Sequence, residues 1–184
     1  TVNKNEIESF ATRTTGSFNV NMNTQVYGLL PIKVGKIQAI RHVISPSLGY
    51  SYRPDFSKEV FGVNPGYYQE IKQDNGESIY FDRFSGTLAG GTPRGENQSM
   101  NISVNNVFQA KIINDDKELK QDLFSWRMST SRNFVAEEFQ WSNLNSSVRA
   151  NINRKLNLDF SMTHDWYEYD KKNNLRINKI KTTG

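Results

Sequence analysis

Apolar and polar residues alternate along several long stretches of the chain, and this period of two predicts β-strands with one apolar and one polar face. The clearest stretch covers residues 99–112, where six of seven even positions are apolar and six of seven odd positions are polar. No helix is expected. The pattern predicts seven strands, near residues 17–30, 37–53, 78–89, 99–112, 123–134, 139–152 and 155–167. The expected connections are a long loop near residues 55–77 and shorter ones near 114–121, 136–138, 153–155 and 168–174.

Two all-β architectures produce such alternation. In a soluble β-sandwich or β-jelly-roll the apolar face packs into a core, whereas in a membrane barrel it meets lipid and the other face lines a polar lumen. Sandwich strands usually have about 5–6 residues and tilted membrane strands about 9–11, and the longer strands are expected here. Aromatic residues also gather near the ends of the segments, among them Trp126, Trp141 and Trp166. The pattern therefore favours an antiparallel transmembrane β-barrel of the outer-membrane type.

Composition changes this picture little, but it removes several functional classes. The chain is only 36% hydrophobic, yet aromatic residues make up 12% of it, which is not typical of a disordered segment. The net charge of +4 is spread along the chain, so nucleic-acid binding has little electrostatic support. Because the chain has no cysteine, disulfides, zinc thiolate sites and thiol nucleophiles are excluded. No apolar stretch is long enough for a transmembrane helix, so strands would have to cross any membrane.

The chain opens without a Met or a secretory signal, and both of its ends resemble cuts. We therefore expect it to be part of a longer protein.

Candidate chemistry is sparse, and no catalytic, metal-ligating or cofactor-binding residue is predicted. His42 and His164 have no ligand spacing between them, so structural roles are expected, His42 at the start of a strand and His164 on an apolar face near a strand end. The pairs Asp115–Asp116 and Glu137–Glu138 fall in predicted turns, where acidic residues are usually solvated. Residues 90–98 are rich in glycine but lack the Lys-Ser/Thr ending of a phosphate-binding loop, and they are expected to form a turn. We therefore expect a protein that is not an enzyme.

Three basic residues on the predicted polar face are the best candidates for a binding role. Lys111, Arg127 and Arg149 face the expected lumen, where they would meet an anionic ligand. The alternative is that they form cross-strand ion pairs, with Asp159 and Asp165 as the available partners.

The stretch at residues 40–56 carries a spacing that is more specific than the alternation. Its sequence, IRHVISPSLGYSYRPDF, places prolines inside and directly after a predicted strand; we expect the first to mark a bulge or an unpaired position and the second to mark the strand's exit. The spacing of arginine, proline, two tyrosines and a second proline resembles a segment of LptD, the outer-membrane protein of lipopolysaccharide assembly. The residues concerned are Arg41, Pro46, Tyr50, Tyr52 and Pro54.

The resemblance to the LptD family covers roughly residues 17–180 and includes similarity at 98–112, 129–134 and 176–180. It implies a location in the cell outer membrane among outer-membrane lipids, and no covalent chemistry. It also implies a function: lipopolysaccharide is received from a periplasmic Lpt bridge and released into the outer leaflet, with an LptE-like plug lipoprotein in the lumen. The family's barrel is larger and follows a periplasmic β-jelly-roll domain, neither of which fits in 184 residues. The resemblance therefore implies that residues 1–184 are a single segment of a larger barrel. The alternatives are a soluble β-sandwich at the cell surface, as a binding or structural module, and a barrel for protein secretion or nutrient uptake.

Overall fold

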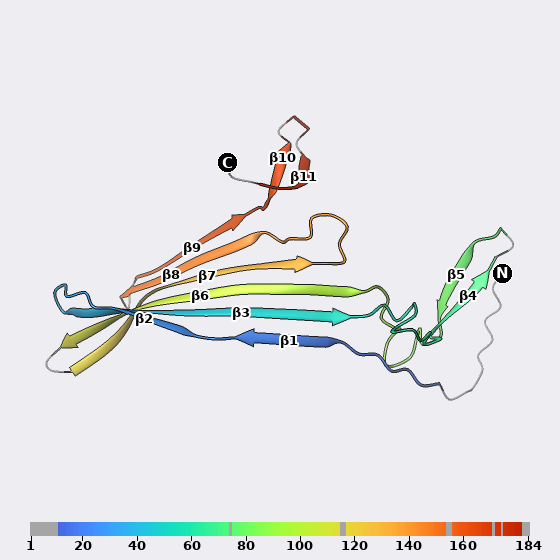
Figure 1. The fold of residues 1–184 in the computed structure, drawn as a ribbon, viewed down its shortest axis with the longest axis horizontal. Coiled ribbons are helices and arrows are strands. Elements are labelled where there is room, and N and C mark those ends of the chain that lie inside the picture. Colours follow the sequence, from blue (N-terminus) through green and yellow to red (C-terminus); the bar gives the residue numbers. More distant parts are fainter. Residues whose placement is uncertain are drawn as a thin grey trace. The chain divides into compact units, whose positions relative to one another are not determined.

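A computed structural model of the chain describes residues 11–73, 75–114, 117–153, 156–170, 172–173 and 175–181. These residues form an all-β structure with antiparallel pairing wherever a register is defined (Figure 1). The strands are β1 (Phe18–Asn23), β2 (Val26–Leu30), β3 (Ile37–Arg53), β4 (Tyr68–Lys72), β5 (Ser78–Asp82), β6 (Asn97–Asn114), β7 (Lys117–Asn133), β8 (Leu144–Asn153), β9 (Leu156–His164), β10 (Tyr167–Asp170) and β11 (Leu175–Ile180).

The chain divides into two compact units. Of the described residues, the larger unit contains those in the ranges 19–52 and 97–181, and the smaller unit contains those in the ranges 11–18 and 53–96. In the larger unit the strands pair in the order β1-β3-β6-β7-β8-β9, and β2 also pairs with β3 (Figure 1). Within the described residues this sheet is open, with β1 and β2 along one edge and β9 at the other. The predicted all-β, antiparallel architecture is thus confirmed, without closure of the sheet into a barrel.

The sheet has two chemically different faces because residues of similar polarity lie opposite each other on neighbouring strands. Val104 lies opposite Met128, and Val148 lies between Trp126 on β7 and Phe160 on β9. Alternate residues on the same strands place asparagine, serine and charged side chains on the reverse face. Among the described residues, only four hydrophobic side chains are buried, namely those of Ala39, Phe56, Ala110 and Tyr167. Large apolar side chains such as Phe160, which is 63% exposed, have no second layer packed over them in this part of the chain.

The first predicted strand is interrupted, while the second has the expected bounds. Residues 17–30 form two strands, β1 and β2, separated by Thr24 and Gln25, and both pair with β3. The backbone N–H of Thr24 donates to the carbonyl of Pro46 at 3.3 Å. The missing N–H of Pro46 therefore falls beside the break between β1 and β2, where no regular ladder bond is lost. β3 ends at Arg53, and Pro54 follows it directly, as expected for a strand exit.

The predicted loop at 55–77 was wrong in part, because it contains β4. This strand pairs with β5 in a hairpin, with Tyr68 opposite Asp82 and Lys72 opposite Ser78. The dipeptide Asn75-Gly76 in the connection is a strong hairpin signal, and Gly76 has the positive φ of 83° that such turns require. The strand expected over 78–89 ends at Asp82, because the carboxylate of Asp82 accepts a hydrogen bond from the N–H of Phe84 and begins a turn.

Three further boundaries differ from expectation. β6 runs to Asn114 and β7 starts at Lys117, so most of the connection expected at 114–121 is strand; Asp115 and Asp116 lie outside the described residues. The alternation does not show that β6 and β7 continue through this segment, because the register between them shifts next to Phe108. The shift changes the phase of the apolar and polar positions. The connection between β7 and β8 extends to residue 143, later than expected, and includes Glu137 and Glu138. Residue 167 is expected to end a strand and residues 168–174 to form a turn, whereas Tyr167–Asp170 pairs with Leu175–Ile180 as β10 and β11.

The two ends of the large sheet carry connections of different length. At one end β6 is followed closely by β7, and β8 by β9. At the other end the chain leaves β3 at Arg53 and enters β6 at Asn97, and the connection from Asn133 to Leu144 starts and finishes at the same end. The turn expected at 153–155 belongs to the first end, and its residues 154 and 155 lie outside the described part of the chain.

Candidate functional site: a polar groove on the sheet

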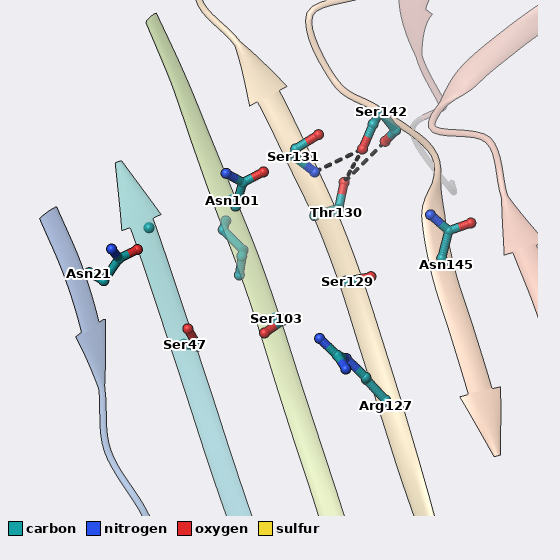
Figure 2. Close-up of a pocket in the computed structure, with 12 residues that line it drawn as sticks. Asn21, Ser47, Asn101, Ser103, Arg127, Ser129, Thr130, Ser131, Ser142 and Asn145 are labelled. Atoms are coloured by element: carbon teal, nitrogen blue, oxygen red, sulfur yellow. Dashed lines mark hydrogen bonds between the residues drawn. The ribbon is translucent and has the colours of Figure 1, made fainter. Parts of the chain in front are cut away.

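Polar side chains from five strands line an open groove on the polar face of the large sheet (Figure 2). Its volume is about 310 Å³, at the lower end of the range of small-molecule sites. Serine hydroxyls and asparagine amides both donate and accept hydrogen bonds, which suits the hydroxyl groups of sugars. None of the described lining residues is acidic. The polar lining residues are Asn21, Ser47, Asn101, Ser103, Arg127, Ser129, Ser131, Ser142 and Asn145. Thr130 also lines the groove, although its position opposite Ile102 places it on the apolar side of β7.

One wall of the groove depends on a glycine. The side chain of Asn21 on β1 lies over Gly49 on β3, so that a Cβ added to Gly49 would come within 2.8 Å of Asn21 Oδ1. The absence of a side chain at Gly49 therefore lets Asn21 reach across its neighbouring strand.

The opposite wall is held by hydrogen bonds between β7 and the segment before β8. The Oγ of Ser142 accepts from the N–H of Ser131 at 2.8 Å, and the hydroxyl of Thr130 donates to the carbonyl of Ser142 at 3.0 Å (Figure 2). Trp166 Nε1 also donates to Thr130 Oγ1 at 3.3 Å. These contacts fix Ser142 beside the end of β7, although it lies outside any strand.

Arg127 is the cation of the groove, and it has no ion-pair partner among the described acidic residues. Its cross-strand neighbours are Asn105 on β6 and Ser147 on β8, both of which are neutral. A guanidinium in this setting offers its donors to an anionic group, such as a phosphate or a carboxylate.

The other two predicted basic residues are engaged by carboxylates. Lys111 Nζ pairs with Glu118 Oε1 at 2.5 Å, and Arg149 Nε donates to Asp159 Oδ1 at 2.6 Å. Asp159 lies directly opposite Arg149, so this is a cross-strand pair. Asp165, the other partner considered, lies beyond β9 and pairs with Arg176 at 2.7 Å. The structure thus brings only Arg127, of the three, into the groove.

Four of the five spaced residues of the 41–54 segment lie on β3 and divide between its two faces, and Pro54 follows the strand. The Arg41 guanidinium lies 4.7 Å from the centre of the Tyr27 ring, and Arg41 is opposite Leu29. Tyr50 accepts a hydrogen bond from Gln98 Nε2 at 2.7 Å, and its ring is 6.5 Å from that of Phe134. Tyr52 is two positions further along the same strand and therefore shares the face of Tyr50.

The segment at residues 41–54 lies within the part of the chain that matches a known protein family. The family model described as LptD protein matches residues 1–167. The chain belongs to the LptD protein family. Membership indicates a role in lipopolysaccharide transport or assembly, carried out by a transporter component of the outer membrane. Comparison with curated proteins and with solved structures gives no match.

The two histidines of this LptD-family chain have structural contacts. His42, expected at the start of a strand, lies in the middle of β3, where its ring stacks on Phe108 at 4.1 Å and its Nε2 is 3.1 Å from Asn106 Oδ1. His164 is the last residue of β9 and lies opposite Leu144. Over the described ranges, no group of three or more His, Asp or Glu residues is placed to hold a metal ion, and no helix of membrane-spanning length occurs.

Sequence reasoning found the polar face of this LptD-family chain but not the groove within it. The alternation identifies residues such as Asn101, Ser103 and Ser129 as polar-face residues. The contribution of Asn21 depends on the pairing of β1 with β3, and the contribution of Ser142 depends on a loop that folds back against β7. Neither contact has a signal in the spacing of the sequence.

Proposed function

We propose that the larger unit forms part of the wall of an outer-membrane β-barrel that transfers lipopolysaccharide to the outer leaflet, without covalent chemistry. The observation that carries this proposal is the two-faced sheet. Its strands β3, β6 and β7 have 17, 18 and 17 residues, which is ample for spanning a bilayer. Its apolar face would meet lipid, and its polar face would line a wet lumen.

The polar groove is the part of this wall that we assign to the cargo. Sugar hydroxyls would exchange hydrogen bonds with the serine and asparagine side chains, and Arg127 would meet phosphate groups as they pass. Contacts of this kind are weak individually and allow the cargo to move on, which a transport path requires. By resemblance to the family, a periplasmic Lpt bridge would deliver the cargo and an LptE-like lipoprotein would occupy the lumen.

The unequal connections give this wall an orientation. Outer-membrane barrels have short periplasmic turns and longer extracellular loops. The sheet end that carries the connections from Arg53 to Asn97 and from Asn133 to Leu144 would therefore face the outside. The end with the β6–β7 and β8–β9 connections would face the periplasm.

The experiment that tests the cargo assignment replaces Arg127 by glutamine in the full-length LptD-family protein. We expect lipopolysaccharide to reach the cell surface more slowly, by several fold, because the groove loses its uncompensated cation. The measurement is the rate at which newly made lipopolysaccharide becomes accessible to an impermeant probe. Arg149→Gln is the matched control, since Asp159 already neutralises Arg149. Equal rates in the wild type and the Arg127 variant would contradict the assignment.

A second measurement tests the membrane setting and separates it from the soluble β-sandwich. The exposed apolar face predicts that the full-length protein needs detergent to stay in solution. A folded, monomeric protein in buffer without detergent would contradict the barrel.

A further inference from the structure

Arg132 on β7 is a cation on the apolar face of the sheet. It lies opposite Met100, on the same face as Met128 and Trp126, so it belongs to the apolar side. It is the only arginine or lysine with a described side chain on that face of β1, β2, β3 and β6–β9. A charge on a surface that meets lipid is costly unless it reaches the headgroup region or a partner.

The Arg132 side chain is held in place but not neutralised. Its guanidinium carbon lies 4.8 Å from the centre of the Phe134 ring and 5.5 Å from that of Trp141. Nε and Nη2 both donate to Gln140 Oε1, at 3.2 and 2.8 Å. The described residues place no carboxylate within ion-pair distance and no acceptor on Nη1, although a guanidinium has five N–H donors.

The loop around Arg132 is closed by backbone hydrogen bonds, so the arrangement is pre-formed. The N–H of Asn133 donates to the carbonyl of Gln140, and the N–H of Ser142 donates to that of Ser131, each at 2.8 Å. Gln140 is itself fixed, because its Nε2 donates to the carbonyl of Ala136 at 3.0 Å. Little side-chain entropy would therefore be lost when an anion binds.

Arg176 shows what a completed arrangement of the same kind contains. It also lies against two rings, 4.8 Å from Phe139 and 4.7 Å from Tyr167. Unlike Arg132, it pairs with a carboxylate, that of Asp165, at 2.7 Å. Arg132 thus differs from Arg176 in having no carboxylate partner among the described residues.

We propose that Arg132 binds a phosphate group of lipid A in the outer leaflet, on the lipid-facing side of the wall and away from the groove that handles cargo. This inference rests on the proposed membrane setting, in which Arg132, next to the last residue of β7, lies at the outward end. At that depth an arginine between aromatic rings meets the headgroup layer. The planar fork of its donors matches the oxygens of a phosphate.

The test compares the wild type and its variants in their binding of lipids with and without phosphate groups, using the full-length protein in detergent. The probes are lipid A, the same lipid A with its phosphates removed, and phosphatidylglycerol, with individual lipid binding measured by native mass spectrometry. We expect phosphate removal to weaken binding to the wild type by about tenfold, since a charge-assisted hydrogen bond is lost. Arg132→Gln should lose most of this dependence, Arg132→Lys should retain part of it, and Arg176→Gln should behave like the wild type.

A second measurement uses the wild-type protein, so that its result does not depend on whether a variant folds. Lipid A should protect Arg132 from phenylglyoxal, as read by peptide mapping, and phosphate-free lipid A should not. The proposal is overturned if phosphate removal weakens the wild type and Arg132→Gln equally, or if phosphatidylglycerol shows the same dependence on Arg132 as lipid A. Failure of the membrane setting is distinguishable, because the wild type would then be soluble without detergent and would bind none of the lipids.

Discussion

Asp82, at the end of β5, organises the segment that follows it in the smaller unit. Its carboxylate accepts hydrogen bonds from the N–H of Thr92 at 2.6 Å, the hydroxyl of Thr92 at 2.8 Å and the N–H of Phe84 at 3.0 Å. Burial raises the pKa of Asp82, but these hydrogen bonds outweigh burial and hold the pKa below its ordinary value. Because β4 and β5 have only five residues each, this site lies outside the strands that we assign to the membrane.

The lowered pKa of Asp82 gives a pH dependence with a defined sign. The stabilisation is fully present above the ordinary carboxyl pKa of about 4 and is lost as the pH falls through the lower pKa of the folded state. Asp82→Asn should remove it at neutral pH. We expect a cost of about 1 kcal/mol, or roughly fivefold faster amide exchange over residues 83–92. Hydrogen exchange read by mass spectrometry measures this effect, and Glu96→Gln is the control. Unchanged exchange in the Asp82 variant would show that the three hydrogen bonds do not hold the segment.

Pro46 leads to a prediction about which positions within a strand tolerate a proline. Its missing N–H lies beside the break at Thr24 and Gln25, so Pro46→Ala restores a donor that finds no regular partner. We expect the variant to change the free energy of unfolding by less than about 0.5 kcal/mol. Val104→Pro, in the middle of β6 between two paired strands, should cost about 3 kcal/mol or more. Denaturant unfolding of the full-length protein in detergent measures both. A large effect of Pro46→Ala would mean that the break is not where the proline is accommodated.

At the scale of single elements, β8 tests the assignment of the two faces. Val148 lies opposite Trp126 and Phe160, whereas Asn151 lies opposite Asn157 on the reverse face. Val148→Arg should cost about 2–4 kcal/mol near the middle of the bilayer, while Asn151→Arg should cost little. The measurement is the unfolding free energy in lipid bilayers. Equal tolerance at both positions would contradict the assigned faces.

The elements that sequence reasoning located well are those with long, uninterrupted alternation. β3 has the predicted bounds, and β6 includes all of residues 99–112. The alternation does not locate an element where one residue changes its phase, as at the register shift next to Phe108, or where a strand is short and polar, as in β4. At the candidate site the same limit applies. Alternation identifies the face of Arg127, but the contacts of Asn21 and Ser142 arise from tertiary packing that has no periodic signal.

At the scale of the whole molecule, the proposed orientation can be tested by single cysteine substitutions within these 184 residues, which contain no cysteine of their own. Ser85→Cys in the smaller unit and Glu137→Cys between β7 and β8 lie in the long connections. We expect both to react with an impermeant maleimide on intact cells. Lys33→Cys, between β2 and β3, should react only after the outer membrane is permeabilised. The reverse pattern would invert the orientation, and it would also remove the basis for an outer-leaflet lipid at Arg132.

The insertion of the smaller unit between β3 and β6 has a consequence for the order of folding. Strands β6 to β9 are consecutive along the chain, and each pairs with the next, so their contacts are local and we expect them to form early. Pairing β3 with β6 must instead close a loop of roughly forty residues, which carries a larger entropic cost. Early folding of the smaller unit would bring Arg53 and Asn97 closer and reduce that cost. Substitutions such as Asp82→Asn should therefore slow the addition of β1, β2 and β3 to the sheet, even though the finished sheet keeps all of its own contacts.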